Sequence, residues 1–532
     1  MLLKNGKIYI ERGVFARDLR TEDGIIAEVG DLEAVPGEEI IDLEGRTVVP
    51  GFNDSHLHLI MNGYNLNQPD LKSARSVDDL IEKCRSFIRE NPETVRNGMF
   101  ASGWNQDLFE EDRRIPTRED MDRISTEMPV VLRRTCAHIA CAITLAVKML
   151  GLGADSEQFD GGRFTFGPDG EPDGIFYEGA VKMIMGVIPK PDMKAARKFM
   201  LDSMHNALSM GVTSVQSNDL GTFYPNTPDL REMIDSAFRD GLCPVRYHYQ
   251  AAYPSPDDFL KDCEAGLFDG KYRESLGTVT TGDLKLFKDG TLGVRTALMT
   301  DDYADMPGEK GTEVLSDEDL CRFIDIAEQY GVRICIHTIG DEAARRTLAC
   351  FEKHMARGNP LRHGIIHFQI TDRGIIEKTV GLGLQVQYQP IFLNYDMHIV
   401  ESRVGKQLAS TSYAFGTFSG LGGDMSFSTD CPVETLNPFN NIYSAVTRKD
   451  LSGYPDGGWN PGERLDVETC IDAYTLGSAR CQFQEEYKGR LRKGFAADMA
   501  VLDRDIFTCD PVEIKDIRPC MTIAGGRIVY TR

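Results

Sequence analysis

The apolar and polar positions of the chain predict a repeating unit in which a helix is followed by a short buried strand. Ser316 is a favourable helix N-cap, apolar residues recur at helical spacing after it, and Gly331 suits the position just past a helix end. The run 332–336 is apolar except at one position, which is typical of a strand buried on both faces. This predicted strand ends in a polar residue, His337.

The same unit recurs further along the chain. We expect Asp341 to cap a helix over 342–356, and residues 361–367 and 383–389 to form two further strands. The first of these strands ends in His367. Alternating helices and short apolar strands predict an α/β barrel, in which catalytic groups gather at the carboxyl ends of the strands.

Two more polar positions lie at the ends of strand-like runs. His56 and His58 close the run 47–59, and their i, i+2 spacing on a strand directs both imidazoles to the same side, where they can reach one metal ion. Asp430 closes the run 426–430. Each residue alone is also explained as a structural residue that ends a strand. The order His-x-His, His, His, Asp favours a metal site over that explanation.

This order resembles the amidohydrolase superfamily, whose members carry an HxH pair, a lysine, two histidines and an aspartate on successive barrel strands. Residues 43–56 and 489–503 resemble the terminal segments of that family, so the resemblance covers nearly the whole chain. The stretch 283–293, Asp-Leu-Lys-Leu-Phe-Lys-Asp-Gly-Thr-Leu-Gly, is similar to the YtcJ-like branch, which includes N-substituted formamide deformylases.

The resemblance implies the fold and the domain organisation. We expect an α/β protein with a metal-dependent (β/α)8 TIM barrel over residues 51–485. A small β-sandwich domain is expected from both termini, 1–50 with 486–532. An inserted domain after the first barrel strand, residues 61–201, is expected to cover the active site.

The resemblance also implies a set of metal ligands for Zn²⁺, with Mn, Fe or Co as alternatives. His56, His58 and Asp430 would hold a first ion, His337 and His367 a second, and Lys285 would bridge them after carboxylation by CO2. Lys288 lies three positions from Lys285, so the two face opposite sides of one strand. Glu178 is a rival source of the carboxylate, and an unmodified Lys285 would indicate a single metal ion.

These ligands predict a hydrolase that cleaves a C–N bond of a small molecule, in an amide, N-formyl compound or cyclic amide. A metal-activated hydroxide would attack the carbonyl, with Asp430 as the general base. Candidate substrate-binding residues, each with a structural role as its alternative, are Trp104, Arg134, His138 and Glu178.

The sequence leaves two other functions open. A metal enzyme of the same fold could act on another bond, by ester hydrolysis, decarboxylation or isomerisation. A catalytically silent binding protein could keep the same fold. The complete ligand set argues against the silent protein, because a drifted site would be expected to lose a ligand.

The charge, the apolar stretches and the cysteines of the chain limit the classes of partner and the compartment that we expect. The 532 residues carry a net charge of −23 without a clustered basic run, which argues against a nucleic-acid partner. The sequence contains no apolar stretch of about 18 residues that could span a membrane. The 13 cysteines include no Cys-x-x-Cys motif, and we expect free thiols in a reducing cytoplasm. The expected partner is a small-molecule substrate, and a homodimer is left open.

Overall fold

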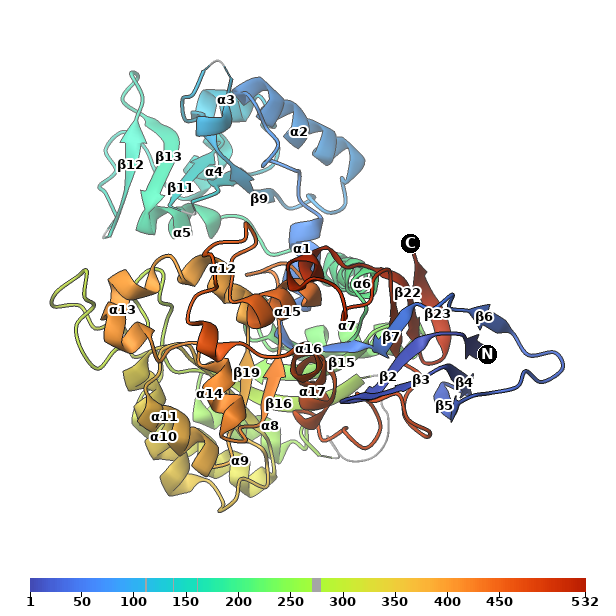
Figure 1. The fold of residues 1–532 in the computed structure, drawn as a ribbon. Coiled ribbons are helices and arrows are strands. Elements are labelled where there is room, and N and C mark those ends of the chain that lie inside the picture. Colours follow the sequence, from blue (N-terminus) through green and yellow to red (C-terminus); the bar gives the residue numbers. More distant parts are fainter. Residues whose placement is uncertain (111, 137, 160, 270–278) are drawn as a thin grey trace. The chain divides into compact units, whose positions relative to one another are not determined.

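The computed structural model describes residues 1–110, 112–136, 138–159, 161–269 and 279–532 (Figure 1). These residues form two compact units, Met1–Leu59 with Ser203–Arg532 and Ile60–Asp202. Within the described ranges, every helix is too short or too polar to cross a membrane.

Eight parallel strands form the largest sheet of the first unit, and their order in the sheet follows their order in the chain. They are β8 (Phe52–Leu57), β14 (Val212–Leu220), β15 (Arg246–Ala252), β16 (Val279–Phe287), β17 (Ile334–Thr338), β18 (Gly364–His367), β19 (Gln385–Tyr388) and β20 (Met425–Phe427). The two edges of the sheet also approach each other. Ser55 Oγ of β8 donates to the carbonyl of Phe427 at 2.9 Å. The sheet is therefore a nearly closed, TIM-barrel-like sheet in an α/β fold, as the sequence predicted.

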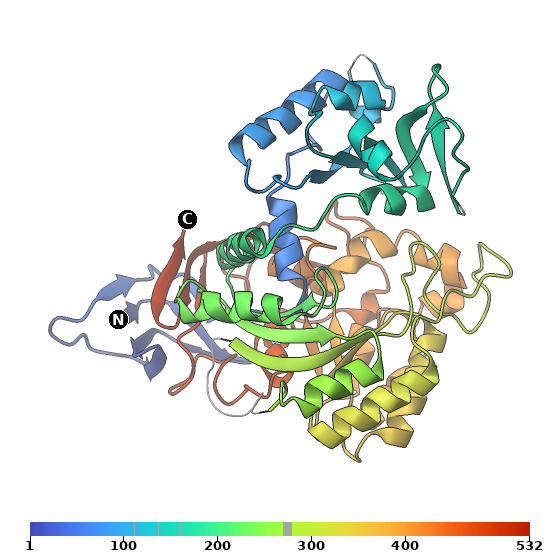
Figure 2. The ribbon, with the colours of Figure 1, turned by 180° about the vertical axis from the view of Figure 1, so that it is seen from behind.

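Helices alternate with the barrel strands, and the two views show the yellow helices α9 and α10 side by side (Figures 1 and 2). The longer helices after β14 are α7 (Pro228–Arg239), α8 (Pro256–Glu264), α9 (Asp317–Tyr330), α10 (Asp341–His354), α11 (Arg373–Gly381), α13 (Val400–Ala409) and α15 (Pro438–Thr447). Shorter ones are α12 (Leu393–Asp396), α14 (Phe415–Gly420), α16 (Val467–Asp472) and α17 (Ser478–Arg480). Helix α6 (Met193–Ser209) precedes β14.

The predicted helix after Ser316 is confirmed as α9. The Ser316 side chain accepts the N–H of Asp319, and Gly331 ends the helix with a left-handed φ of 67°. The cap predicted at Asp341 is wrong, because Gly340 is the N-cap of α10 and Asp341 is its first residue. Asp341 instead accepts the N–H of Thr300 at 3.0 Å.

The strand predicted over 361–367 is shorter in the structure, where β18 begins at Gly364. Arg362 has a left-handed φ of 54°, which is rare for a residue other than glycine and interrupts the extended backbone just before β18. His363 Nε2 lies 3.1 Å from Glu328, so this polar residue leads into the strand and contacts α9.

N-terminal strands form one further sheet of the first unit by themselves and a second one together with C-terminal strands. One sheet has the order β5 (Ile25–Gly30), β4 (Asp18–Glu22), β1 (Leu2–Lys4), β6 (Ile40–Asp42). The other has the order β23 (Arg527–Thr531), β22 (Pro519–Ala524), β21 (Met499–Leu502), β7 (Thr47–Pro50), β2 (Lys7–Glu11), β3 (Val14–Ala16). One apolar cluster joins them, with Leu19 and Val48 from the N-terminal part and Val501 and Ile523 from the C-terminal part.

The second unit has a five-stranded sheet of its own. Its order is β12 (Gly162–Phe166), β13 (Pro172–Glu178), β11 (Ile139–Ala142), β10 (Val130–Arg134), β9 (Met99–Trp104). Its helices are α1 (Leu59–Leu66), α2 (Val77–Glu90), α3 (Arg118–Asp122), α4 (Thr144–Met149) and α5 (Gly179–Met185). Leu80, Leu132 and Phe176 are among the residues of its core. That this unit covers the active site stays a prediction.

Candidate metal centre

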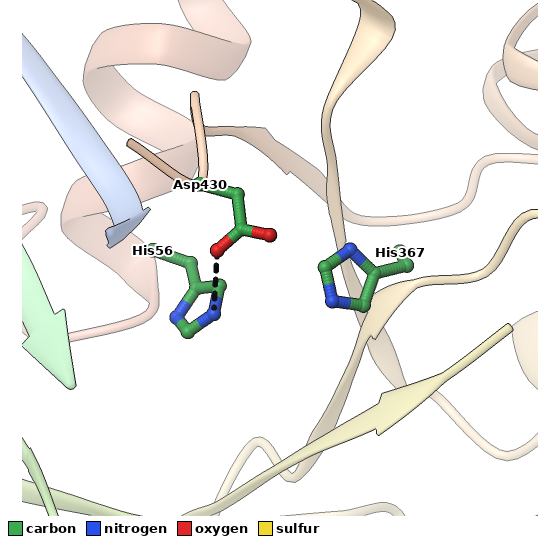
Figure 3. A group of neighbouring side chains, drawn as sticks. All are labelled: His56, His367 and Asp430. Carbon is green, nitrogen blue, oxygen red and sulfur yellow. Dashed lines mark ion pairs between the residues drawn. The ribbon is translucent and has the colours of Figure 1, made fainter. Parts of the chain in front are cut away.

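Three side chains at the carboxyl ends of barrel strands converge closely enough to hold one metal ion. One ligand atom from each of His56, His367 and Asp430 lies within 4.8 Å of the other two, and all three residues are buried. His56 lies on β8, His367 ends β18, and Asp430 follows β20. Figure 3 shows the His56 ring and the Asp430 carboxylate pointing toward each other, with the His367 ring facing them.

His58 belongs to the same cluster. The Nε2 atoms of His56 and His58 lie 3.4 and 3.3 Å from the same oxygen, Oδ1 of Asp430. The i, i+2 spacing therefore does bring both imidazoles to one side of the strand, as expected.

His337 lies beside this group, with its ring centroid 4.4 Å from that of His367. The His367 centroid is also 6.0 Å from that of His56. His367 therefore lies between His337 and the pair of His56 and Asp430, and the pairing of His337 with His367 on a second ion stays a prediction. His367 has a left-handed φ of 76°, which is rare for a residue other than glycine and sets the direction of its side chain.

The two lysines of the 283–293 segment lie in different environments. Lys285 is buried on β16, and its Nζ has no hydrogen-bond partner among the described residues. Lys288 is also buried, but its Nζ lies 2.7 Å from Glu313 and 2.5 Å from Asp317. Lys288 is therefore neutralised by carboxylates away from the histidines, whereas Lys285 remains available to the cluster.

A hydrogen bond to the His56 ring, on the side away from the cluster, determines which of its nitrogen atoms faces the cluster. Gln250 Nε2 donates to the carbonyl of Ser55 at 3.1 Å, and a carbonyl can only accept. The other end of this amide, Oε1, therefore faces His56 Nδ1 at 2.6 Å, and Nδ1 must carry the proton. The lone pair of His56 Nε2 is left to point at Asp430 and at any metal ion.

Hydrogen bonds also fix the orientation of the other three histidine rings. Gln389 Nε2 donates to the carbonyl of Gln387 at 3.0 Å, so its Oε1 accepts from His367 Nδ1 at 2.7 Å. His58 Nδ1 donates to the carbonyl of Asn218 at 2.9 Å. His337 is reversed, because its Nε2 lies 2.9 Å from the carbonyl of Gly290, which leaves Nδ1 as the free nitrogen.

Burial and neighbouring charges keep most of these imidazoles neutral, the form that binds metals. Burial and the positive charge of Lys285 lower the pKa of His56 well below its usual value and that of His337 to about 4. Burial, His337 and Lys285 lower the pKa of His367. Burial also lowers the pKa of His58, but its contact with Asp430 outweighs this effect and raises the pKa.

Backbone and side-chain contacts hold Asp430 in place beside β8. The N–H of Asp430 donates to the carbonyl of His56 at 3.0 Å. Thr429 Oγ1 donates to the buried carboxylate of Asp54 at 2.6 Å. Asp430 itself has a left-handed φ of 54°, and such backbone conformations cluster at functional sites. Its Oδ1 makes no hydrogen bond among the described residues.

The predicted substrate-binding residues of the second unit have different surroundings. Trp104 is fully buried in that unit's core and donates its indole N–H to the carbonyl of Leu132 at 3.0 Å, so the structure does not support a stacking role on substrate. The guanidinium of Arg134 is held by Asn105, Gln106 and Asp107.

His138 and Glu178 form an exposed pair within the second unit. His138 Nδ1 lies 2.8 Å from Glu178 Oε2, and both side chains are more than half exposed there. The structure therefore gives Glu178 a partner other than the metal cluster of the barrel.

Comparison with known proteins gives matches along nearly the whole chain. The model of the amidohydrolase family matches residues 39–530. YtcJ of Bacillus subtilis, whose name assigns it to the amidohydrolases, is 31% identical over 99% of this chain and 98% of its own length. An N-substituted formamide deformylase of Arthrobacter pascens is 23% identical over 94% of this chain and 91% of its own. The crystal structure of an uncharacterized metal-dependent hydrolase of Pyrococcus horikoshii has a TM-score of 0.78 and 27% identity, covering 96% and 98% of the two chains.

Proposed function

The chain belongs to the amidohydrolase family and is a hydrolase, and from that premise we propose that it cleaves a C–N bond in a small amide, N-formyl compound or cyclic amide. The observation that carries the proposal is the convergence of His56, His367 and Asp430, each buried and within 4.8 Å of the others. The N-substituted formamide deformylase among its relatives supports an N-acyl or N-formyl amine as the substrate class.

The donor set suits Zn²⁺, with Mn, Fe or Co as alternatives. Neutral imidazole nitrogens and a carboxylate oxygen are the usual ligands of such ions. Two ligands held tetrahedrally at about 2.0–2.2 Å from zinc lie about 3.3–3.6 Å apart. The Nε2 atoms of His56 and His58 lie 3.4 and 3.3 Å from Asp430 Oδ1, which fits that spacing. When bound, the ion acts as a Lewis acid that acidifies water and polarises a carbonyl.

Asp430 is the proposed general base. Its Oδ1 makes no hydrogen bond among the described residues, so a lone pair is free to accept a proton from water. The carboxylate can then return that proton to the leaving nitrogen, which would otherwise depart as an unstable amide anion. The contacts of Asp430 with His56 and of Thr429 with Asp54 hold this carboxylate in position.

Lys285 is the proposed bridging residue. Burial lowers the pKa of Lys285 to about 8, so part of the amine is unprotonated at neutral pH. An unprotonated amine adds to CO2 and loses a proton, which gives a carbamate whose negative charge suits a cation. The exposed His138 and Glu178 stay as proposed substrate contacts.

The proposal is tested by metal analysis and activity together. We expect the purified protein to hold about one to two divalent ions per chain and to hydrolyse at least one member of a panel of N-acyl amines, N-formyl amines and cyclic amides. Removal of the ion by a chelator should abolish that activity, and added Zn²⁺ should restore it. Full activity of protein that contains and takes up no metal would refute the mechanism. Activity on esters alone would refute the C–N assignment.

A second prediction concerns the hydrogen bond from His56 to Gln250. Leucine at position 250 removes the acceptor of His56 Nδ1 but keeps the apolar bulk, so the imidazole loses its fixed tautomer and orientation. We expect Gln250→Leu to weaken zinc binding by about 10–100-fold, measured by competition with a chromophoric chelator.

The matched control is Gln216→Leu. Gln216 is a fully buried glutamine of the neighbouring strand β14, and its Nε2 donates to the carbonyl of Ser478 at 2.8 Å. Equal zinc affinity of Gln250→Leu and wild type, or equal losses in both variants, would contradict the positioning role of Gln250.

A further inference from the structure

Two cysteines on neighbouring helices have their sulfur atoms in contact. Cys321 lies on α9, Cys350 lies on α10, and their Sγ atoms are 2.8 Å apart although 29 residues separate them in the chain. The two helices lie side by side in both views (Figures 1 and 2) and flank strand β17, which carries His337.

The surroundings of the two sulfur atoms differ. Cys350 is buried, and its Sγ also lies 3.6 Å from the carbonyl of Asp317 at the start of α9. Cys321 is partly exposed. Cys321 is therefore the more accessible of the two residues, and the Cys350 sulfur lies against its sulfur.

We propose that Cys321 and Cys350 are a site of reversible disulfide formation, with a low-molecular-weight disulfide such as oxidised glutathione as the oxidant. The thiolate of Cys321 attacks the reagent, forms a mixed disulfide and expels one small thiolate. The Cys350 sulfur then loses its proton, attacks Cys321 Sγ and expels the second small thiolate. The two protein thiols are oxidised, the reagent is reduced to two thiols, and the two protons pass to the released thiolates.

The geometry permits this cross-link with little movement. A disulfide bond is about 2.03–2.05 Å long, so the two sulfur atoms must approach by less than about 1 Å. Such a change lies within reach of small side-chain rotations. The bond would tie α9 to α10 on either side of β17.

The surroundings also indicate that ring closure is the slow step. Burial and the neighbouring Cys321 thiol raise the pKa of Cys350 to about 12, so Cys350 is protonated at neutral pH. Since the thiolate is the attacking species, exchange is slow at neutral pH and faster in alkaline solution.

The direct test is peptide mapping of the full-length protein after incubation with oxidised glutathione at pH 8.5. We expect a non-reduced peptide pair that joins Cys321 to Cys350, with the loss of two hydrogen atoms, and its disappearance after treatment with dithiothreitol. Hydrogen exchange should slow in α9 and α10 of the oxidised protein. A stable glutathione adduct on Cys321 without the cross-link would overturn the proposal, as would both thiols remaining free while other cysteines react.

Variants separate this pair from the remaining cysteines. Cys321→Ser and Cys350→Ser should each abolish the slowing of hydrogen exchange under the oxidant. The control Cys509→Ser removes another partly buried cysteine and should leave it unchanged. Slowing that persists in Cys350→Ser would also overturn the proposal. If a serine variant fails to fold, the wild-type peptide map still decides.

Discussion

Replacement of Asp430 by asparagine is expected to lower kcat by roughly 10²–10⁴-fold while much of the metal stays bound. Asparagine keeps the shape of the side chain and one oxygen for the ion, but an amide cannot take the proton from water. Asparagine also tolerates the left-handed φ of 54° at this position better than alanine does, so the loop should keep its conformation. The measurement is kcat with the best substrate of the panel, together with metal content.

The control for this variant is Asp450→Asn. Asp450 has the same 7% exposure as Asp430, but its carboxylate is held by Ser452 and the backbone N–H of Tyr454. We expect a kcat close to that of wild type in the control. A kcat of Asp430→Asn near the wild-type value would make Asp430 a structural residue only.

The residues of the cluster could be predicted because one signal, a polar residue at the end of an apolar run, is local. That signal singled out His56, His58, His337, His367 and Asp430, and the structure brings these side chains together. The spacing of Lys285 and Lys288 showed that they face opposite sides of one strand, and the resemblance to the YtcJ-like branch selected Lys285.

The partners of the histidines and the contact that holds Thr429 beside Asp430 could not be predicted, because both depend on distant parts of the chain. Gln250 is 194 residues from His56, and Thr429 is 375 residues from Asp54. Gln389 stands at the end of the predicted strand 383–389, so the strand-end signal is present there. A glutamine is no metal ligand of the usual kind, and only the arrangement in space gives it a role.

Trp104 illustrates a second limit. Its rarity suggested a binding residue, but an aromatic residue on a strand looks the same in sequence whether it faces a core or a ligand. The cap of α10 and the start of β18 were misplaced by a few residues for a related reason. Asp341 accepts a hydrogen bond from Thr300, and His363 contacts Glu328. These tertiary contacts override the local preference of Asp341 for a helix cap and of the residues before Gly364 for a strand.

Replacement of Arg333 by methionine is expected to reduce the free energy of unfolding of the first unit by about 3–5 kcal/mol. Arg333 is fully buried just before β17, with Nη1 2.5 Å from Asp283 and Nε donating to the carbonyl of Arg362 at 2.7 Å. Methionine fills part of the volume but leaves the buried Asp283 carboxylate without this counter-charge. Arg333 lies before the start of β17, whereas the metal cluster lies at the carboxyl ends of the strands. We therefore expect the folded variant to keep the metal cluster unchanged.

The pH dependence of the lost stability of Arg333→Met shows whether the unpaired Asp283 charge causes it. In the wild type, burial raises the pKa of Asp283, but the positive charge of Arg333 and the contact with His248 outweigh this effect and lower the pKa, so the carboxylate is ionised at neutral pH. Without Arg333, burial is opposed only by His248, 3.6 Å away, and we expect it to raise the pKa of Asp283 above the unfolded value. The folded variant then binds a proton that the unfolded chain does not, and its stability rises as the pH falls. The difference in the free energy of unfolding between wild type and Arg333→Met should therefore be smaller at pH 5 than at pH 8.

Urea unfolding followed by the fluorescence of Trp459 measures this change in the first unit, in a Trp104→Phe background that removes the other tryptophan. Adding Asp283→Asn to Arg333→Met replaces the stranded charge by a neutral amide and should recover part of the loss. A deficit that is independent of pH and unaffected by Asp283→Asn would mean that lost packing, rather than an unpaired buried charge, destabilises the variant. The stability of the barrel near the start of β17 would then depend on the shape of the Arg333 side chain rather than on its charge.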